Sequence, residues 1–110
     1  MTSENLAALL AKRVMGWGVG PDRFLTGNRG WISRWRFQPT ERLADALRLL
    51  EKAAPGEYDM RGDGEGNVRV HVRIGDATGE ACGPSKARAI TYAIARAFGI
   101  QVDGAQADAV

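Results

Sequence analysis

The sequence predicts an α+β fold in which about three helices pack on a three-stranded antiparallel meander, in the order α-α-β-β-β-α. Apolar and polar residues alternate strictly over residues 68–74, which predicts a strand with one buried face. Apolar residues recur at helical spacing in three other segments, two before this strand and one after it. The 110 residues, 45% hydrophobic and 25% charged, have the composition of a globular protein. We therefore predict one domain over residues 1–100, followed by a frayed tail over 101–110.

The first predicted element is an amphipathic helix that is capped by Ser3 and stopped by Gly16. Its apolar stripe consists of Leu6, Leu9, Leu10 and Val14. Residues 16–30 contain five glycines and one proline, so we predict an ordered loop there rather than regular structure. Residues 31–37 mix aromatic side chains with arginines, and we predict a short strand or an extended segment.

The second helix is predicted after Pro39, with Thr40 as its N-cap and Pro55-Gly56 at its end. Its apolar stripe consists of Leu43, Ala46, Leu47 and Leu50. The hydrophobic period then changes from helical to alternating, and glycine-rich turns separate three segments. These predicted strands lie near residues 57–61, 68–74 and 77–81.

The third helix is predicted to follow Gly83-Pro84-Ser85 and to stop at Gly99, since proline is tolerated in a first turn and glycine ends helices. The side chains spaced to face the sheet are Ala87, Ile90, Ile94, Ala97 and Phe98. The chain therefore has no internal repeat, and its last helix is expected to cover the meander.

Charge is unevenly distributed along a chain whose formal net charge is only +2. Residues 1–54 hold nine Lys/Arg and five Asp/Glu, whereas residues 55–110 hold six and eight. An anionic partner is therefore expected on the first half. The first residues lack the basic and apolar regions of a signal peptide, and no apolar run approaches the ~20 residues of a membrane span. We expect a cytoplasmic protein without membrane contact.

Catalytic and metal-binding chemistry is poorly represented in the sequence. The chain has one histidine, His71, and one cysteine, Cys82, too few for a structural zinc site or a disulfide. His71 lies on the polar phase of its strand and Cys82 beyond the end of the next one, with no third residue at a triad spacing. We predict a protein that is not an enzyme, with no catalytic residues, no metal and no cofactor.

Two segments have residue types that suit a base and a phosphate. Around Trp31 and Trp35, the arginines Arg34 and Arg36 would combine flat π-faces with guanidinium groups, as base stacking and phosphate contact require. Core packing of the two tryptophans is the competing interpretation. At the start of the third helix, unpaired N–H groups and the helix dipole would favour an anion, and this turn carries Ser85, Lys86 and Arg88. A well-started helix with solvated cations is the alternative there.

A third candidate surface lies on the central strand. Arg69, His71 and Arg73 point from one face and the apolar residues of the same strand from the other. If that polar face is open, it is a basic shelf; if a helix covers it, the arginines must be paired with acids.

Several short runs resemble the phage ABA sandwich family of small bacteriophage and prophage proteins. They are Val14-Met15-Gly16-Trp17, Phe37-Gln38-Pro39-Thr40, Gly79-Glu80-Ala81 and Pro84-Ser85-Lys86-Ala87-Arg88-Ala89-Ile90. The resemblance covers roughly residues 5 to 100 and implies a phage-encoded protein with helices on a small antiparallel sheet, without catalytic residues to carry over. The order of strands and final helix also resembles a double-stranded-RNA-binding domain, whose last helix begins with basic residues.

Together these features predict a phage accessory protein that sequesters a small anionic ligand, such as a cyclic or modified nucleotide signal of bacterial defence. We expect a homo-oligomer, because small domains often build ligand pockets between subunits. One alternative is binding of nucleic acid, double-stranded RNA or DNA or a single strand, through Arg34, Arg36, Arg69, Arg73, Lys86 and Arg88. The other is a protein–protein inhibitor of a host factor that uses exposed aromatic side chains as anchors.

Overall fold

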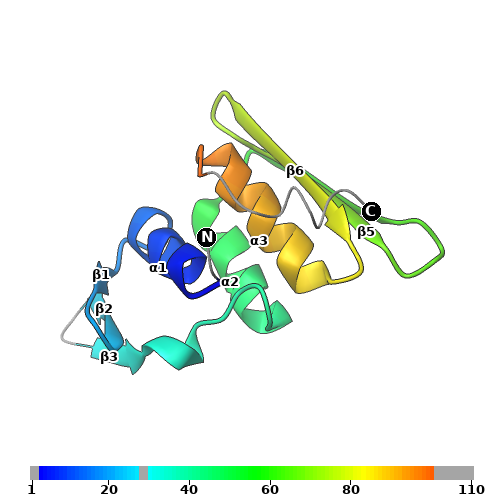
Figure 1. Ribbon diagram of the computed structural model, residues 1–110. Helices are drawn as coiled ribbons and strands as arrows, with labels where there is room; N and C mark the ends of the chain where they lie inside the picture. The colour runs from blue at the N-terminus through cyan, green and yellow to red at the C-terminus, as the bar shows by residue number, and fades with distance from the viewer. Residues whose placement is uncertain (1–2, 28–29, 101–110) are drawn as a thin grey trace.

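A computed structural model describes residues 3–27 and 30–100 of the chain. Its helices are α1 (Ser3–Arg13), α2 (Leu43–Ala53) and α3 (Lys86–Ala97), with a short 3-10 helix η1 (Arg34–Arg36). One antiparallel sheet contains β1 (Gly18–Val19), β2 (Arg23–Gly27) and β3 (Gly30–Ser33), and the other contains β4 (Glu57–Gly62), β5 (Val68–Ile74) and β6 (Ala77–Gly83). Figure 1 shows the three helices lying between the two sheets. The α+β class and the predicted meander are confirmed.

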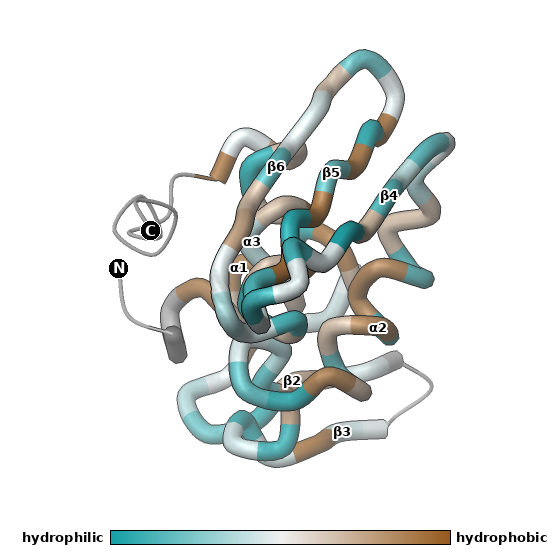
Figure 2. The backbone as a smooth tube through the Cα atoms, turned by 90° about the vertical axis from the view of Figure 1, so that its right-hand side faces the viewer, coloured by the Kyte–Doolittle hydropathy of each residue, from teal (hydrophilic) through white to brown (hydrophobic). Residues whose placement is uncertain are grey.

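The meander β4-β5-β6 packs one face against α3. Its inward residues on β5 are Val68, Val70 and Val72, which are all buried, and they alternate with exposed or half-buried polar residues. Figure 2 shows this alternation along β5 as a change of colour between brown and teal. The facing side of α3 buries Ile90, Ala93 and Ile94 completely. The alternation of apolar and polar residues along β5 therefore determines which face of the sheet helix α3 covers.

Helix α3 begins and ends where the sequence predicts. Ser85 is the N-cap, and its hydroxyl accepts a hydrogen bond from the Arg88 N–H at 3.2 Å. Gly99 follows the helix with a φ of 75°, a left-handed conformation that glycine adopts readily. The carbonyl of Phe98 accepts a hydrogen bond from Arg13 at 2.9 Å, which ties the end of α1 to the end of α3.

Helix α2 starts later than predicted, and Thr40 is not its N-cap. The helix begins at Leu43 with Arg42 in the cap position, whereas Thr40 is buried in the preceding turn. A carboxylate further along the helix explains this start, because Asp45 Oδ2 accepts the Gln38 N–H at 3.0 Å. The side chain of Asp45 thus fixes the connection between η1 and α2 from inside the helix.

The glycine-rich segment contains regular structure that the sequence did not predict. Residues 18–19, 23–27 and 30–33 form the sheet β1-β2-β3, although the prediction for residues 16–30 was an ordered loop. Gly18 lies close to its cross-strand partner, since a Cβ there would be 3.3 Å from the Cβ of Leu25, a tight contact. Inward-facing Phe24 packs with Trp17 and Phe37, with ring centroids 5.1–5.9 Å apart. Aromatic burial therefore holds together strands that glycine would otherwise weaken.

The remaining segments agree with the predictions or fall outside the described residues. Residues 31–37 contain the end of β3 followed by η1, so the strand expected there is confirmed for its first part only. The frayed tail was predicted for residues 101–110, which lie outside the described residues. Within residues 3–27 and 30–100, no helix is long and apolar enough to cross a membrane.

Candidate functional site

The ten residues proposed from the sequence lie in three parts of the structure. Four of them, Trp31, Arg34, Trp35 and Arg36, are on β3 and η1. Three more, Ser85, Lys86 and Arg88, are at the start of α3. The last three, Arg69, His71 and Arg73, are on the face of β5 that points away from α3. The first two groups approach one another, whereas the third lies on the other side of the helical layer.

Both tryptophans of the first group are on the surface. The side chain of Trp31 is 54% exposed and that of Trp35 is 62% exposed, which excludes the core-packing interpretation for both. A guanidinium group lies over each ring: the Arg23 Cζ is 4.5 Å from the Trp31 ring centroid, and the Arg36 Cζ is 6.0 Å from that of Trp35. Exposed indole faces paired with cations can stack on a planar ligand.

Strand parity explains why Trp31 faces outward. Trp31 pairs with Leu25 across β2 and β3, and Ile32 pairs with Phe24. Phe24 is buried in the aromatic cluster, so its face of the sheet is the inner one, and the Leu25–Trp31 face is exposed. The exposure of Trp31 is therefore a consequence of the burial of Phe24.

A small pocket lies beside this segment, on the inner side of the same sheet. It has a volume of about 170 Å³, and it lies between α1, β2, η1 and the turn before α2. Its lining residues are Ala7, Phe24, Arg34, Phe37, Gln38, Thr40 and Glu41. A cavity of roughly 150 Å³ accommodates benzene, whereas pockets for drug-sized ligands measure about 300–1,000 Å³. The pocket therefore has room for one ring-sized group and not for a complete nucleotide.

The walls of the pocket combine aromatic and charged groups. The guanidinium group of Arg34 lies over Phe24, with its Cζ 5.6 Å from the ring centroid. The backbone N–H of Arg34 donates a hydrogen bond to the Asp22 carbonyl at 3.1 Å. Phe24 and Phe37 form an apolar floor. A cation above an apolar floor suits a planar group that carries a negative charge at one end.

The first turn of α3 reaches the rim of this pocket through Arg88. Its Nη2 lies 3.7 Å from Oε1 of Glu41, which lines the pocket. The Nε of Arg88 is buried and has no hydrogen-bond partner among the described residues, a state that usually signals a missing partner. The Ser85 hydroxyl is already used as the helix cap, and Lys86 is exposed. Of the three residues predicted on this turn, Arg88 is thus the one that the contacts connect to the pocket.

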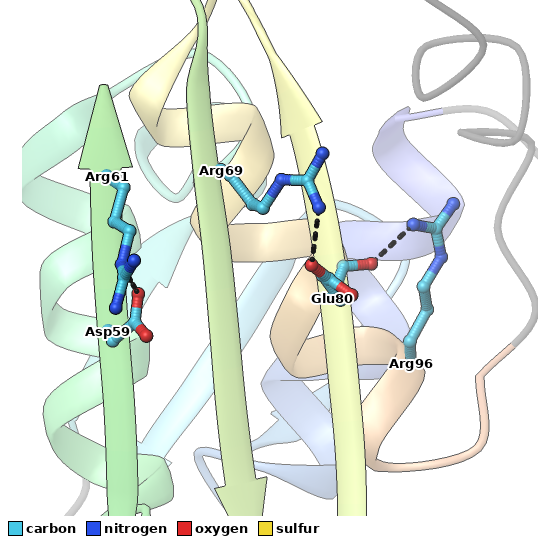
Figure 3. A network of polar contacts seen from close by, with 5 residues as sticks. All are labelled: Asp59, Arg61, Arg69, Glu80 and Arg96. Carbon is cyan, nitrogen blue, oxygen red and sulfur yellow. Dashed lines mark hydrogen bonds and ion pairs between the residues drawn. The ribbon is translucent and has the colours of Figure 1, made fainter. Parts of the chain in front are cut away.

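The third group forms a surface of mixed charge rather than a basic shelf. The face is open, but Arg69 lies 3.2 Å from Glu80 and Arg73 lies 2.8 Å from Glu57 (Figure 3 shows the first pair). His71 has an acid opposite it on each neighbouring strand. Cross-strand acids therefore offset the positive charge that β5 alone would present.

Four residues of the site were missed by the sequence analysis. Arg23 stacks on Trp31, Phe24 and Phe37 form the pocket floor, and Glu41 pairs with Arg88. Only Arg23 could have been proposed from the sequence as a binding residue, since it is a cation in the same basic first half of the chain. The role of Phe24 depends on the β2–β3 pairing, which the sequence did not predict, and those of Phe37 and Glu41 depend on tertiary contacts with Phe24 and Arg88.

These features define a small α+β protein with helices between two antiparallel sheets and a ring-sized pocket beside exposed tryptophans. The chain belongs to the Phage ABA sandwich domain family, which it matches over residues 8–94. It is similar in fold to a phage protein from Bacillus cereus ATCC 14579, known from a crystal structure. The TM-score is 0.75 at 15% sequence identity, and the match covers 94% of this chain and 93% of that one. A search of curated proteins found no match.

Proposed function

We propose that this phage protein is a non-catalytic accessory factor that binds and sequesters a small anionic ligand of nucleotide type in the cytoplasm of the bacterial host. The observation that carries the proposal is the pocket of about 170 Å³ with an aromatic floor and Arg34 in its wall. The family is a phage family, and sequestration of a signal requires binding without turnover. A cyclic or modified nucleotide used in bacterial defence fits this chemistry.

The size of the pocket determines how such a ligand would bind. The base, as a single planar group, would lie on the floor that Phe24 and Phe37 form, and its phosphate would remain at the rim. There Arg34 lines the pocket with its guanidinium group, and Arg88 Nη2 lies beside Glu41. The exposed indole of Trp31 or Trp35 would provide a second stacking surface for a ligand with two bases.

Glu41 opposes an anion at this rim, and its effect can be measured. Its carboxylate lines the pocket and lies 3.7 Å from Arg88. A bound phosphate would have to share or displace that contact. We therefore expect Glu41→Gln to strengthen binding by about threefold, the size of effect typical for an exposed charge pair.

Isothermal titration against mono-, di- and cyclic nucleotides tests the proposal. We expect one nucleotide class to bind the wild-type protein, and Arg34→Ala to weaken that binding by about tenfold or more through loss of a charge-assisted contact. Arg73→Ala is the matched control, because it removes an equally charged, half-exposed side chain from the far sheet. Absence of binding across the panel, or equal losses in the two arginine variants, would refute the proposed site.

The exposed tryptophans favour a second candidate, single-stranded nucleic acid. Residues 12–37 contain six basic residues and one acidic residue, and both Trp31 and Trp35 carry an arginine on the ring face. Oligonucleotide binding followed by tryptophan fluorescence should then weaken by orders of magnitude between 50 and 200 mM salt, because counterions are released from the strand. The double variant Trp31→Ala/Trp35→Ala should abolish it. Binding of a mononucleotide that depends on Arg34 and changes little with salt would favour the first candidate instead.

A further inference from the structure

The two edges of the sheet β4-β5-β6 differ in what covers them. On β6, the carbonyl of Glu80 accepts a hydrogen bond from Arg96 of α3 at 2.6 Å, as Figure 3 shows. On β4, all six residues pair with β5 in unbroken register, without a bulge or a proline. Within the part of the chain that the structure describes, no strand lies beyond β4. A regular edge without such protection is a template for pairing with another strand.

The backbone of β4 points alternate hydrogen-bonding groups outward. The N–H of Asp63 donates to the Asn67 carbonyl at 3.1 Å, just beyond the end of β4 and on the same side as β5. In an antiparallel sheet, every second residue of a strand forms its backbone hydrogen bonds with the strand on one side, and the residues between them point their N–H and C=O groups to the other side. The backbone N–H and C=O groups of the odd-numbered residues of β4 therefore point toward β5, and those of Tyr58 and Met60 point away from the sheet.

Apolar side chains along this edge are incompletely covered. Tyr58 is opposite the buried Val72 and so belongs to the inner face of the sheet, yet its side chain is 55% exposed. Helix α3 packs on β5 and β6, and no helix lies as close to β4. The ring of Tyr58 is therefore left partly in solvent at the edge of the sheet, where a strand added beside β4 would bury part of it.

The charged side chains on the outer face of β4 are complementary to those of a second copy of β4 that runs antiparallel to it. Glu57, Asp59 and Arg61 alternate with the inward residues and are exposed. If a second β4 runs antiparallel about a two-fold axis at Met60, each Asp59 lies opposite the Arg61 of the other copy. If the axis is at Asp59, each Glu57 lies opposite that Arg61. Both registers keep inner residues on the inner face and pair an acid with arginine, but the second also places Asp59 opposite Asp59 of the other copy. Because like charges directly opposite each other are destabilising, the axis at Met60 is favoured.

From these observations we infer that a second copy of this chain binds along β4, forming a two-fold symmetric dimer with a continuous six-stranded sheet. The self-complementary charges select a second copy over an unrelated strand, because the same short segment supplies both the acids and the base. A two-fold interface also uses up the β4 edge of both copies, so the assembly closes at two. Tyr58 then has a neighbour beside it on the inner face, Gly62 of the other copy if the axis is at Met60 and Met60 if the axis is at Asp59.

Arg61→Glu tests the inference because it opposes acids in either register. Sedimentation velocity across a concentration series should show a wild-type dimer and a dissociation constant at least about tenfold higher for the variant. Adding Asp59→Arg should restore the dimer if the axis is at Met60, and adding Glu57→Arg should restore it if the axis is at Asp59. The control is Arg36→Glu, the same change of charge at an exposed arginine of η1, which is not part of this sheet, and it should leave the dimer intact.

Tyr58→Pro provides a test that does not depend on charge. Its N–H faces outward, so proline should preserve the pairing of β4 with β5 and block pairing with another copy. Circular dichroism should show a folded protein, and sedimentation should show a monomer. A wild-type protein that stays monomeric, or a dimer that survives both Arg61→Glu and Tyr58→Pro, would overturn the inference. Neither result bears on the nucleotide pocket, which is measured separately by titration.

Discussion

Gly79 of β6 is the position where an added methyl group should cost the most stability. A Cβ at this residue would overlap the carbonyl oxygen of Ala93 and lie 2.6 Å from the N atom of Ala97. Both atoms belong to the backbone of α3, so relief requires the helix to move away from the sheet. Overpacking of a core costs about 1–3 kcal/mol, and a clash with rigid backbone belongs at or above the upper end. We expect Gly79→Ala to lower the free energy of unfolding by about 3 kcal/mol or more.

Urea denaturation followed by circular dichroism measures this loss. For a domain of this size, about 3 kcal/mol corresponds to a fall in Tm of roughly 12 °C or more. Gly56→Ala is the matched control, because a Cβ there meets no atom within 4 Å. It should change stability by less than about 0.5 kcal/mol or raise it slightly through the unfolded state. If the two variants lose the same amount, close packing of α3 on β6 is not what requires glycine at position 79.

Two further predictions concern side-chain oxygens. Thr91→Val should cost about 1–3 kcal/mol in urea denaturation, because the buried hydroxyl lies 2.8 Å from the Pro39 carbonyl, which would lose its partner; Thr91→Ser should cost less. The pKa of Asp63 should lie below its usual 3.8, chiefly because the Glu65 N–H and then the Asn67 side chain donate to the carboxylate. Its stabilisation of the β4–β5 turn is then present above pH 3.8 and lost as pH falls through the lowered pKa. Carbon NMR titration of Asp63 checks this, and a midpoint at or above 3.8 would contradict it.

The meander and the helix that covers it could be predicted because their signals are local. Strict alternation over 68–74 set both the strand and its buried face, and the glycine turns on either side set its neighbours. Ser85 and Gly99 marked the limits of α3 through capping chemistry that needs no distant partner. The start of α2 was mispredicted for the opposite reason: Asp45 holds the turn at Gln38, a contact between residues seven apart.

The first sheet escaped prediction because its stability is not local. Two of its strands are short and glycine-rich, and propensity alone places such segments in loops. What orders them is the packing of Phe24 against Trp17 and Phe37, which come from three different parts of the chain. The same pairing turns Trp31 outward and creates the pocket, so a missed sheet also meant a missed pocket floor.

The two proposed surfaces can be examined independently because the helical layer separates them. The pocket is built from α1, β2, η1 and the turn before α2, while β4 is at the edge of the opposite sheet (Figure 2). Pairing through β4 would therefore leave both pockets of a dimer accessible and far from the two-fold axis. One ligand should then bind per chain, with equal affinity at protein concentrations above and below the dissociation constant of the dimer. A stoichiometry of one ligand per two chains would instead require a pocket shared across an interface, and would place that interface at β3 and η1 rather than at β4.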